Sequence, residues 1–169
     1  MNIPILYEEP HFMLVNKPAG LFTQAAPGVP SLELALSEQL KVRDQHPGRP
    51  FVGLPHRLDR ATSGVLLVAR NQRALSRFGQ QFQSRKISKH YLALVQGLVP
   101  AGVHTWSDYL RKIPNVAKAE IVQPDEELAR LAEMRVEAIA NFGDKTLAIV
   151  ELLTGRMHQI RLQFASRGF

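Results

Sequence analysis

The strongest structural signal in the sequence is a continuous apolar run, Gly64–Ala69, which directly follows a charged and polar segment. A short uninterrupted run of this kind suits a strand that is buried on both faces. Other strand-type runs lie at residues 5–7, 12–15, 91–95 and 147–152, with weaker signals near 103–109, 118–123 and 134–140. The chain is therefore expected to be rich in strands.

Helical patterns are fewer and stand apart from one another. Ser31 can cap a helix carrying Leu32, Leu34, Leu36 and Leu40, and Asn71 can cap one on which Leu75, Phe78 and Phe82 form a stripe. After Thr154 and Gly155, a third helix would place Met157, Ile160 and Phe164 on one face. Residues 24–30 and 44–55 have loop composition. These patterns predict an α+β fold with a mainly antiparallel mixed sheet and flanking helices.

The length and composition exclude several classes of protein. A chain of 169 residues fits one domain. It contains no cysteine, which excludes disulfides, thiol catalysis, zinc ribbons and iron–sulfur clusters. No apolar run is long enough to span a bilayer, and the first residues lack the pattern of a signal peptide. We therefore expect a cytoplasmic protein without a membrane partner.

Positive charge is concentrated in the middle of the chain. Residues 40–90 hold eleven lysines and arginines against two aspartates, whereas the whole chain has a net charge of +6. Such a concentration favours a polyanionic partner, most simply nucleic acid. A solvated basic surface without a partner explains the charge equally well.

Asp59 is the most conspicuous candidate for chemistry. It lies between Arg57 and Arg60, in a loop directly before the buried strand. A carboxylate held ionised and partly desolvated beside a guanidinium is a competent nucleophile or base. Alternatively, Asp59 only pairs with a neighbouring arginine or bonds the hydroxyls of Thr62 and Ser63 in a turn. The residues by themselves leave both interpretations open.

Other chemistries match the sequence less well. Ser63 lies outside any Gly-x-Ser-x-Gly motif, which disfavours a serine hydrolase. His56, His90 and His158 have no metal-ligand spacing, so no metal site is expected. The glycines form neither a phosphate loop nor a dinucleotide fingerprint.

Two further residues, Tyr91 and Arg161, lie where a site could form. Tyr91 begins an apolar strand, a place typical of core tyrosines whose hydroxyl reaches the rim. On the third predicted helix, Arg161 follows Met157 by four residues and would lie near the buried edge. An arginine there needs a buried partner, and Asp59 is a suitable one.

Four segments occur in a specific order: Asn16-Lys17-Pro18-Ala19-Gly20; His56-Arg57-Leu58-Asp59 with Thr62-Ser63-Gly64; Lys89-x-Tyr91 with Ala93-x-Val95; and Thr154-Gly155-Arg156 with His158-Gln159-Ile160-Arg161. Together they resemble the motifs of the pseudouridine synthases, specifically the RluA family, which modifies ribosomal and transfer RNA. The resemblance covers essentially the whole chain, and it implies that uridine in RNA is isomerised to pseudouridine without a metal or cofactor.

The same resemblance implies roles for individual residues. Asp59 would be the catalytic nucleophile, Tyr91 would pack on the flipped uracil, Arg161 would pair with Asp59, and Arg57 would occupy the space that the target base leaves. The residues expected to contact RNA are Arg57, Arg60, Arg73, Arg77, Lys86 and Lys89. A stem-loop of ribosomal or transfer RNA is the expected substrate, since loops present exposed bases.

The resemblance also implies a domain organisation. Residues 1–169 would form the catalytic domain in the pseudouridine synthase fold, without an S4-type RNA-binding module. Family members continue beyond the position of Phe169, so we expect the C-terminal part of the domain to be missing. A monomer is favoured. The alternatives are a non-catalytic RNA-binding or RNA-folding protein with the same pocket, and a basic structural protein.

Overall fold

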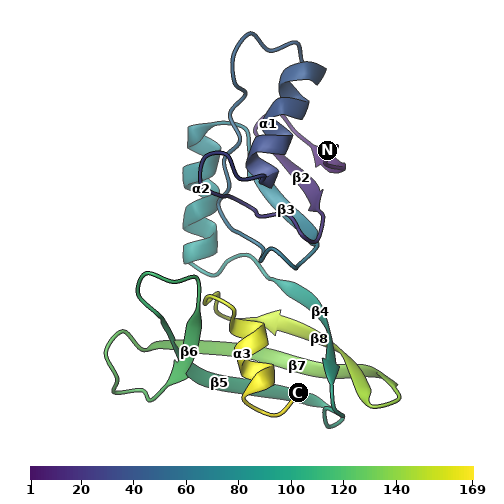
Figure 1. The fold of residues 1–169 in the computed structure, drawn as a ribbon, viewed down its shortest axis with the longest axis vertical. Coiled ribbons are helices and arrows are strands. Elements are labelled where there is room, and N and C mark those ends of the chain that lie inside the picture. Colours follow the sequence, from purple (N-terminus) through teal and green to yellow (C-terminus); the bar gives the residue numbers. More distant parts are fainter. The chain divides into compact units, whose positions relative to one another are not determined.

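The computed structural model describes residues 1–169, which form two compact units, Met1–Lys86 and Ile87–Phe169. Each unit contains one antiparallel sheet, drawn in purple to teal for the first unit and in teal to yellow for the second (Figure 1). All the pairs between named strands are antiparallel. The α+β class with mainly antiparallel strands is confirmed, but the strands are divided between two sheets.

The first unit holds a sheet of order β1-β2-β3 and two helices. Its elements are β1 (Ile5–Glu8), β2 (Phe12–Lys17), α1 (Leu32–Arg43), β3 (Gly64–Ala69) and α2 (Gln72–Gln83). Both helices begin where the sequence predicts: the Ser31 side chain accepts a hydrogen bond from the Leu34 amide, and the Asn71 side chain accepts one from the Ala74 amide.

The core of the first unit is built by alternation along the strands. Met13 pairs with Val68 and Val15 pairs with Leu66, and all four side chains are fully buried. Helix α1 contributes the stripe Leu32, Leu36 and Leu40, spaced by four residues as a helix requires. On α2, Phe78 meets Phe12 of β2 edge to face, with ring centroids 5.5 Å apart. The strands and helices thereby leave two long loops, residues 18–31 and 44–63, to carry polar residues.

The second unit is a five-stranded sheet of order β4-β8-β7-β5-β6 with one short helix. Its elements are β4 (His90–Gln96), β5 (Val103–Lys112), β6 (Ala119–Val122), β7 (Arg130–Phe142), β8 (Lys145–Leu152) and α3 (Gln159–Ala165). Its core contains Trp106, Met134, Val136, Val150 and Phe164, with Phe164 supplied by α3. Since each strand alternates its side chains, the other face of the sheet exposes Leu92 and Leu94 of β4.

Every strand expected from the sequence is present, the weaker ones included. The third helix differs from the prediction. It begins at Gln159, after His158 in the left-handed conformation (φ 53°), so Met157 lies outside it. The predicted stripe is therefore wrong for Met157 only, because Ile160 and Phe164 both pack in the core of the second unit. The buried residues of α3 are Gln159, Gln163 and Phe164. None of the three helices is both long and apolar enough to cross a bilayer.

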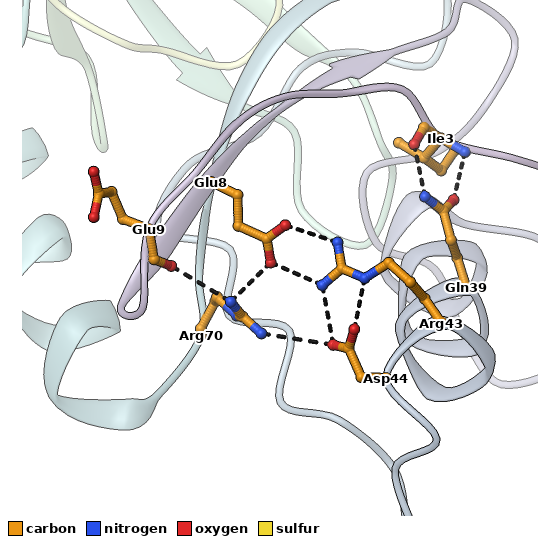
Figure 2. A network of polar contacts seen from close by, with 7 residues as sticks. All are labelled: Ile3, Glu8, Glu9, Gln39, Arg43, Asp44 and Arg70. Carbon is orange, nitrogen blue, oxygen red and sulfur yellow. Dashed lines mark hydrogen bonds and ion pairs between the residues drawn. The ribbon is translucent and has the colours of Figure 1, made fainter.

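An ion-pair network joins three parts of the first unit (Figure 2). Arg43, at the end of α1, donates two hydrogen bonds to the Glu8 carboxylate, at 2.7 and 2.8 Å, and also pairs with Asp44. Arg70, just after β3, contacts Glu8 at 2.7 Å and Asp44 at 3.6 Å. The hydrogen bonds from Arg43 lower the pKa of the Glu8 and Asp44 carboxyl groups, and the charges of Arg43 and Arg70 act in the same direction.

The lowered pKa values make a prediction about acid stability. A carboxyl group with a lowered pKa in the folded state stabilises the fold above its unfolded pKa, and this contribution disappears as the pH falls through the folded value. Arg43→Gln should therefore lower the free energy of unfolding by about 1 kcal/mol at neutral pH, because these pairs are partly exposed. The deficit relative to the unmodified chain should shrink below about pH 4.

Urea unfolding followed by circular dichroism at several pH values measures this difference. Lys118→Gln is the matched control, since Lys118 is an exposed cation in a turn. A deficit of the same size at every pH would contradict the assignment to these carboxylates.

Candidate active site

Asp59 lies in the long loop between α1 and β3, in a part of it that is hydrogen-bonded to the 18–23 segment. Its carbonyl accepts a hydrogen bond from the Thr62 amide at 3.0 Å, which closes a turn. The side chain of Asp59 is half-buried. This turn is made by backbone groups and does not test the alternative role of the Asp59 side chain. The residues on either side of Asp59 are held by the 18–23 segment.

Thr23 holds the residue that precedes Asp59. The Thr23 hydroxyl donates to the Leu58 carbonyl at 2.7 Å and accepts from the Leu58 amide at 3.1 Å. Both residues are buried. A single hydroxyl thereby satisfies both backbone groups of Leu58, which would otherwise lie unpaired away from water.

Gly20 holds the residue that follows Asp59. The Gly20 amide donates to the Arg60 carbonyl at 2.7 Å, and the Arg60 Nε donates back to the Gly20 carbonyl at 3.0 Å. Gly20 has φ +85°, a left-handed conformation that glycine adopts without strain. A side chain at this position would disfavour the turn that brings the two segments together.

Lys17 lies beneath this arrangement and is fully buried. Its ammonium donates to the carbonyls of Leu21 at 2.7 Å, Pro18 at 2.9 Å and Arg60 at 3.4 Å. Burial lowers the pKa of Lys17, and the negative charge of Asp59 opposes that shift. The ammonium is therefore a buried cation whose field reaches the Asp59 carboxylate.

These contacts give Asp59 a fixed position and a fixed electrostatic environment. Leu58 and Arg60 are both tied to the 18–23 segment, so the backbone of Asp59 has little freedom to move. A half-buried carboxylate that interacts electrostatically with a buried cation, in a rigid turn, is suited to act as a nucleophile or base without reorganisation.

His56 has a structural position in the same loop. Its Nε2 accepts a hydrogen bond from the Leu67 amide of β3 at 2.9 Å. Its ring stacks on Phe82 of α2, with centroids 4.4 Å apart and planes 24° from parallel. His56 therefore attaches the second half of the loop to both β3 and α2.

The arginines and lysines predicted to contact RNA are divided between the units. Arg57, Arg60, Arg73, Arg77 and Lys86 all belong to the first unit and are exposed. Arg73 and Arg77 lie four residues apart on α2 and share one helix face. Lys89 belongs to the second unit, is half-buried and donates to the Thr154 carbonyl at 3.3 Å.

Tyr91 and Arg161 belong to the second unit, whereas Asp59 belongs to the first. Tyr91 lies on β4 opposite Val150, is half-buried and packs against the core cluster of Trp106 and its neighbours. Its ring has the core-edge position expected for this strand. The predicted pairing of Asp59 with Arg161 would link the two units and stays a prediction.

Arg161 is exposed on α3. It precedes the buried Phe164 by three residues, so the two residues are neighbours on the helix surface.

A buried amide network fixes the turn between β8 and α3, which carries Thr154, Gly155 and Arg156. The Gln159 side chain accepts from the Thr154 hydroxyl at 2.8 Å and from the Arg156 amide at 3.0 Å. It donates to the Glu133 carbonyl at 3.0 Å and to the Gln163 side chain at 3.1 Å. The turn and the first residues of α3 are thereby attached to β7.

Sequence reasoning assigned no site role to Lys17, Gly20 or Thr23. One signal for Lys17 was present in the alternation of β2: Met13, Val15 and Lys17 are spaced by two and face the same way. A lysine at the third position of a buried face needs acceptors, and these come from loops that strand periodicity does not locate.

Comparison with known proteins points to one family. The family described as RNA pseudouridylate synthase matches residues 11–166. The ribosomal large subunit pseudouridine synthase C of Buchnera aphidicola subsp. Acyrthosiphon pisum is 35% identical over 164 residues, which cover 97% of this chain and 50% of the relative. The chain thus spans about half the length of the curated relatives that it matches.

Solved structures agree in fold. Human RNA pseudouridylate synthase domain containing 1 superposes with a TM-score of 0.78 at 27% identity, over 99% of this chain and 66% of that one. Human RNA pseudouridylate synthase domain containing 4 gives a TM-score of 0.81 at 20% identity, over 97% of this chain and 64% of that one.

The contacts of Lys17 make a prediction about stability. Lys17→Met keeps the aliphatic stem but removes the donor to three carbonyls, so the free energy of unfolding should fall by about 2–3 kcal/mol. Lys41→Met, which replaces an exposed lysine of α1, should change it by no more than about 0.5 kcal/mol. Urea unfolding measures both variants, and equal stability of the two would contradict the anchoring role of Lys17.

Proposed function

Since the chain belongs to the RNA pseudouridylate synthase family, we propose that it isomerises uridine to pseudouridine within RNA. In this reaction the N1–C1′ glycosidic bond breaks, the uracil rotates and a C5–C1′ bond forms. The proton on C5 is lost and N1 gains one, so atoms and electrons balance within one nucleotide. The reaction has no redox step and transfers no group to a second molecule.

The observation that most supports this proposal is the setting of Asp59. Its two neighbours are tied by Thr23, Gly20 and Lys17, and the Lys17 ammonium provides a buried positive charge near the carboxylate. We assign Asp59 as the group that acts on the sugar, either by attack at C1′ or by starting an elimination. A binding protein that only holds RNA has no need for a carboxylate, which repels phosphate.

Tyr91 and Arg161 complete the proposed catalytic set. Tyr91, at the edge of the second unit's core, would pack against the rotated uracil and is the candidate to accept the C5 proton. Arg161 is exposed on α3 and would pair with Asp59, holding it ionised and oriented. The network around Gln159 would give Arg161 a rigid base.

The exposed basic residues of the first unit would bind the RNA backbone. Arg57, Arg60, Arg73, Arg77 and Lys86 would neutralise phosphates around the Asp59 loop, with Lys89 adding to them from the second unit. Extruding a uridine from a stack costs a few kcal/mol, which these contacts would offset. Arg57 would take the place of the extruded base.

The substrate class follows from the same reasoning. A stem-loop of ribosomal or transfer RNA presents bases that are already partly unstacked, which reduces the cost of extrusion. The relatives named for the large ribosomal subunit favour ribosomal RNA over transfer RNA. We propose that the protein acts in the cytoplasm, as a monomer and without a cofactor.

The first test of this function is Asp59→Asn. Incubation of the unmodified chain with unmodified ribosomal and transfer RNA transcripts, followed by mapping of pseudouridine, should reveal a specific site. Asp59→Asn should abolish turnover, because the amide can neither attack nor accept a proton. Its RNA affinity should stay within about threefold, since no phosphate contact is lost. No new pseudouridine with the unmodified chain, despite tight RNA binding, would support a non-catalytic RNA-binding protein.

A second test concerns α2. Arg77→Ala should weaken RNA binding and reduce the slope of log Kd against log salt by about 1, because one phosphate contact is lost. Arg135→Ala is the charge-matched control: Arg135 lies on β7 and pairs with Glu151 at 3.0 Å. Filter binding at several salt concentrations measures both, and identical slopes for the two variants would contradict an RNA contact at α2.

A further inference from the structure

Phe22 is an exposed aromatic residue within the structure that holds Asp59. Its neighbours Leu21 and Thr23 are buried, whereas 37% of Phe22 is exposed. The alternation along this short extended segment makes Phe22 face outward. The backbone of Phe22 is fixed, because its carbonyl accepts from the Leu32 amide at 2.8 Å at the start of α1.

Arg60 lies over the ring of Phe22. Its guanidinium carbon is 5.1 Å from the ring centroid, within the range of a cation–π contact. The guanidinium is also oriented by its hydrogen bond from Nε to the Gly20 carbonyl, at 3.0 Å. The result is an exposed planar cation over an exposed aromatic ring, both attached to backbone that is fixed by hydrogen bonds.

This pair lies next to the proposed reacting group. Arg60 directly follows Asp59, so their Cα atoms are about 3.8 Å apart. When a uridine leaves its stack to reach Asp59, the adjacent base loses a stacking partner. Aromatic rings and arginine planes are the groups on which proteins stack unpaired bases.

We propose that Phe22 and Arg60 form a platform on which one unpaired base next to the target uridine stacks. The inference rests on the proposed function for the identity of the ligand as RNA. It adds Phe22, an uncharged residue, to a binding surface otherwise made of cations. The platform would select single-stranded or loop RNA, because a paired base has both faces occupied by its neighbours.

Phe22→Leu in the full 169-residue chain tests the platform. The probe is a single-stranded oligouridine of about 12 nucleotides, and its Kd is measured by fluorescence anisotropy at low and high potassium chloride. Removal of the ring should raise Kd about tenfold, with the salt slope unchanged because no charge is lost. An RNA duplex of the same length should show a change of no more than about twofold.

Phe51→Leu is the matched control, since Phe51 is exposed to a similar extent (41%) in the same unit and no arginine lies over its ring. It should alter Kd for oligouridine by no more than about twofold. Phe22→Tyr, which keeps the ring, should bind like the unmodified chain. Equal affinity of Phe22→Leu and Phe51→Leu for oligouridine would overturn the platform.

A second measurement does not depend on the folding of any variant. Oligouridine carrying 5-iodouridine, irradiated in complex with the unmodified chain, should form a crosslink at Phe22, located by mass spectrometry of the digested protein. Crosslinks found only at other residues would overturn the proposal.

Binding and crosslinking do not require turnover. A chain that crosslinks at Phe22 but forms no pseudouridine would therefore retain the platform and lose the proposed function. Normal turnover of the unmodified chain, together with no effect of Phe22→Leu on the Kd for oligouridine, would retain the proposed function and overturn the platform.

Discussion

The buried ammonium of Lys17 is the interaction on which the rest of the candidate site depends. A lysine inside a small core must find acceptors, and three backbone carbonyls, those of Pro18, Leu21 and Arg60, supply them. These carbonyls belong to two loops that are far apart in the sequence. Satisfying one cation therefore brings the 18–23 segment against the Asp59 loop. The Lys17 ammonium also acts electrostatically on the Asp59 carboxylate.

Each unit organises its part of the proposed site by the same principle, a polar side chain that meets several backbone groups at once. In the first unit, Thr23 pairs with both the amide and the carbonyl of Leu58. In the second, Gln159 connects Thr154, Arg156, Glu133 and Gln163. Such fully satisfied networks rigidify loops that have no regular secondary structure. The proposed chemistry at Asp59 and the proposed base stacking at Phe22 both depend on that rigidity.

The strands and the first two helices could be predicted because their signals are local. Apolar runs and period-two alternation identify strands, and Ser31 and Asn71 cap helices by hydrogen bonds within three residues. The third helix was mispredicted because its start depends on a residue in a left-handed conformation, His158, and on the Gln159 side chain. Apolar spacing alone extended the helix back to Met157, which lies outside α3.

The sequence by itself determined the α+β class, the concentration of positive charge in residues 40–90 and the order of the four motifs. These properties depend on residue type and short spacing, which the chain carries before it folds. Only the tertiary structure decided that Lys17 is buried, that Leu58 and Arg60 are held on either side of Asp59, and that Phe22 lies exposed under Arg60. Those facts arise from hydrogen bonds between loops about 35 to 45 residues apart, whose meeting depends on how the strands and helices pack rather than on local preference.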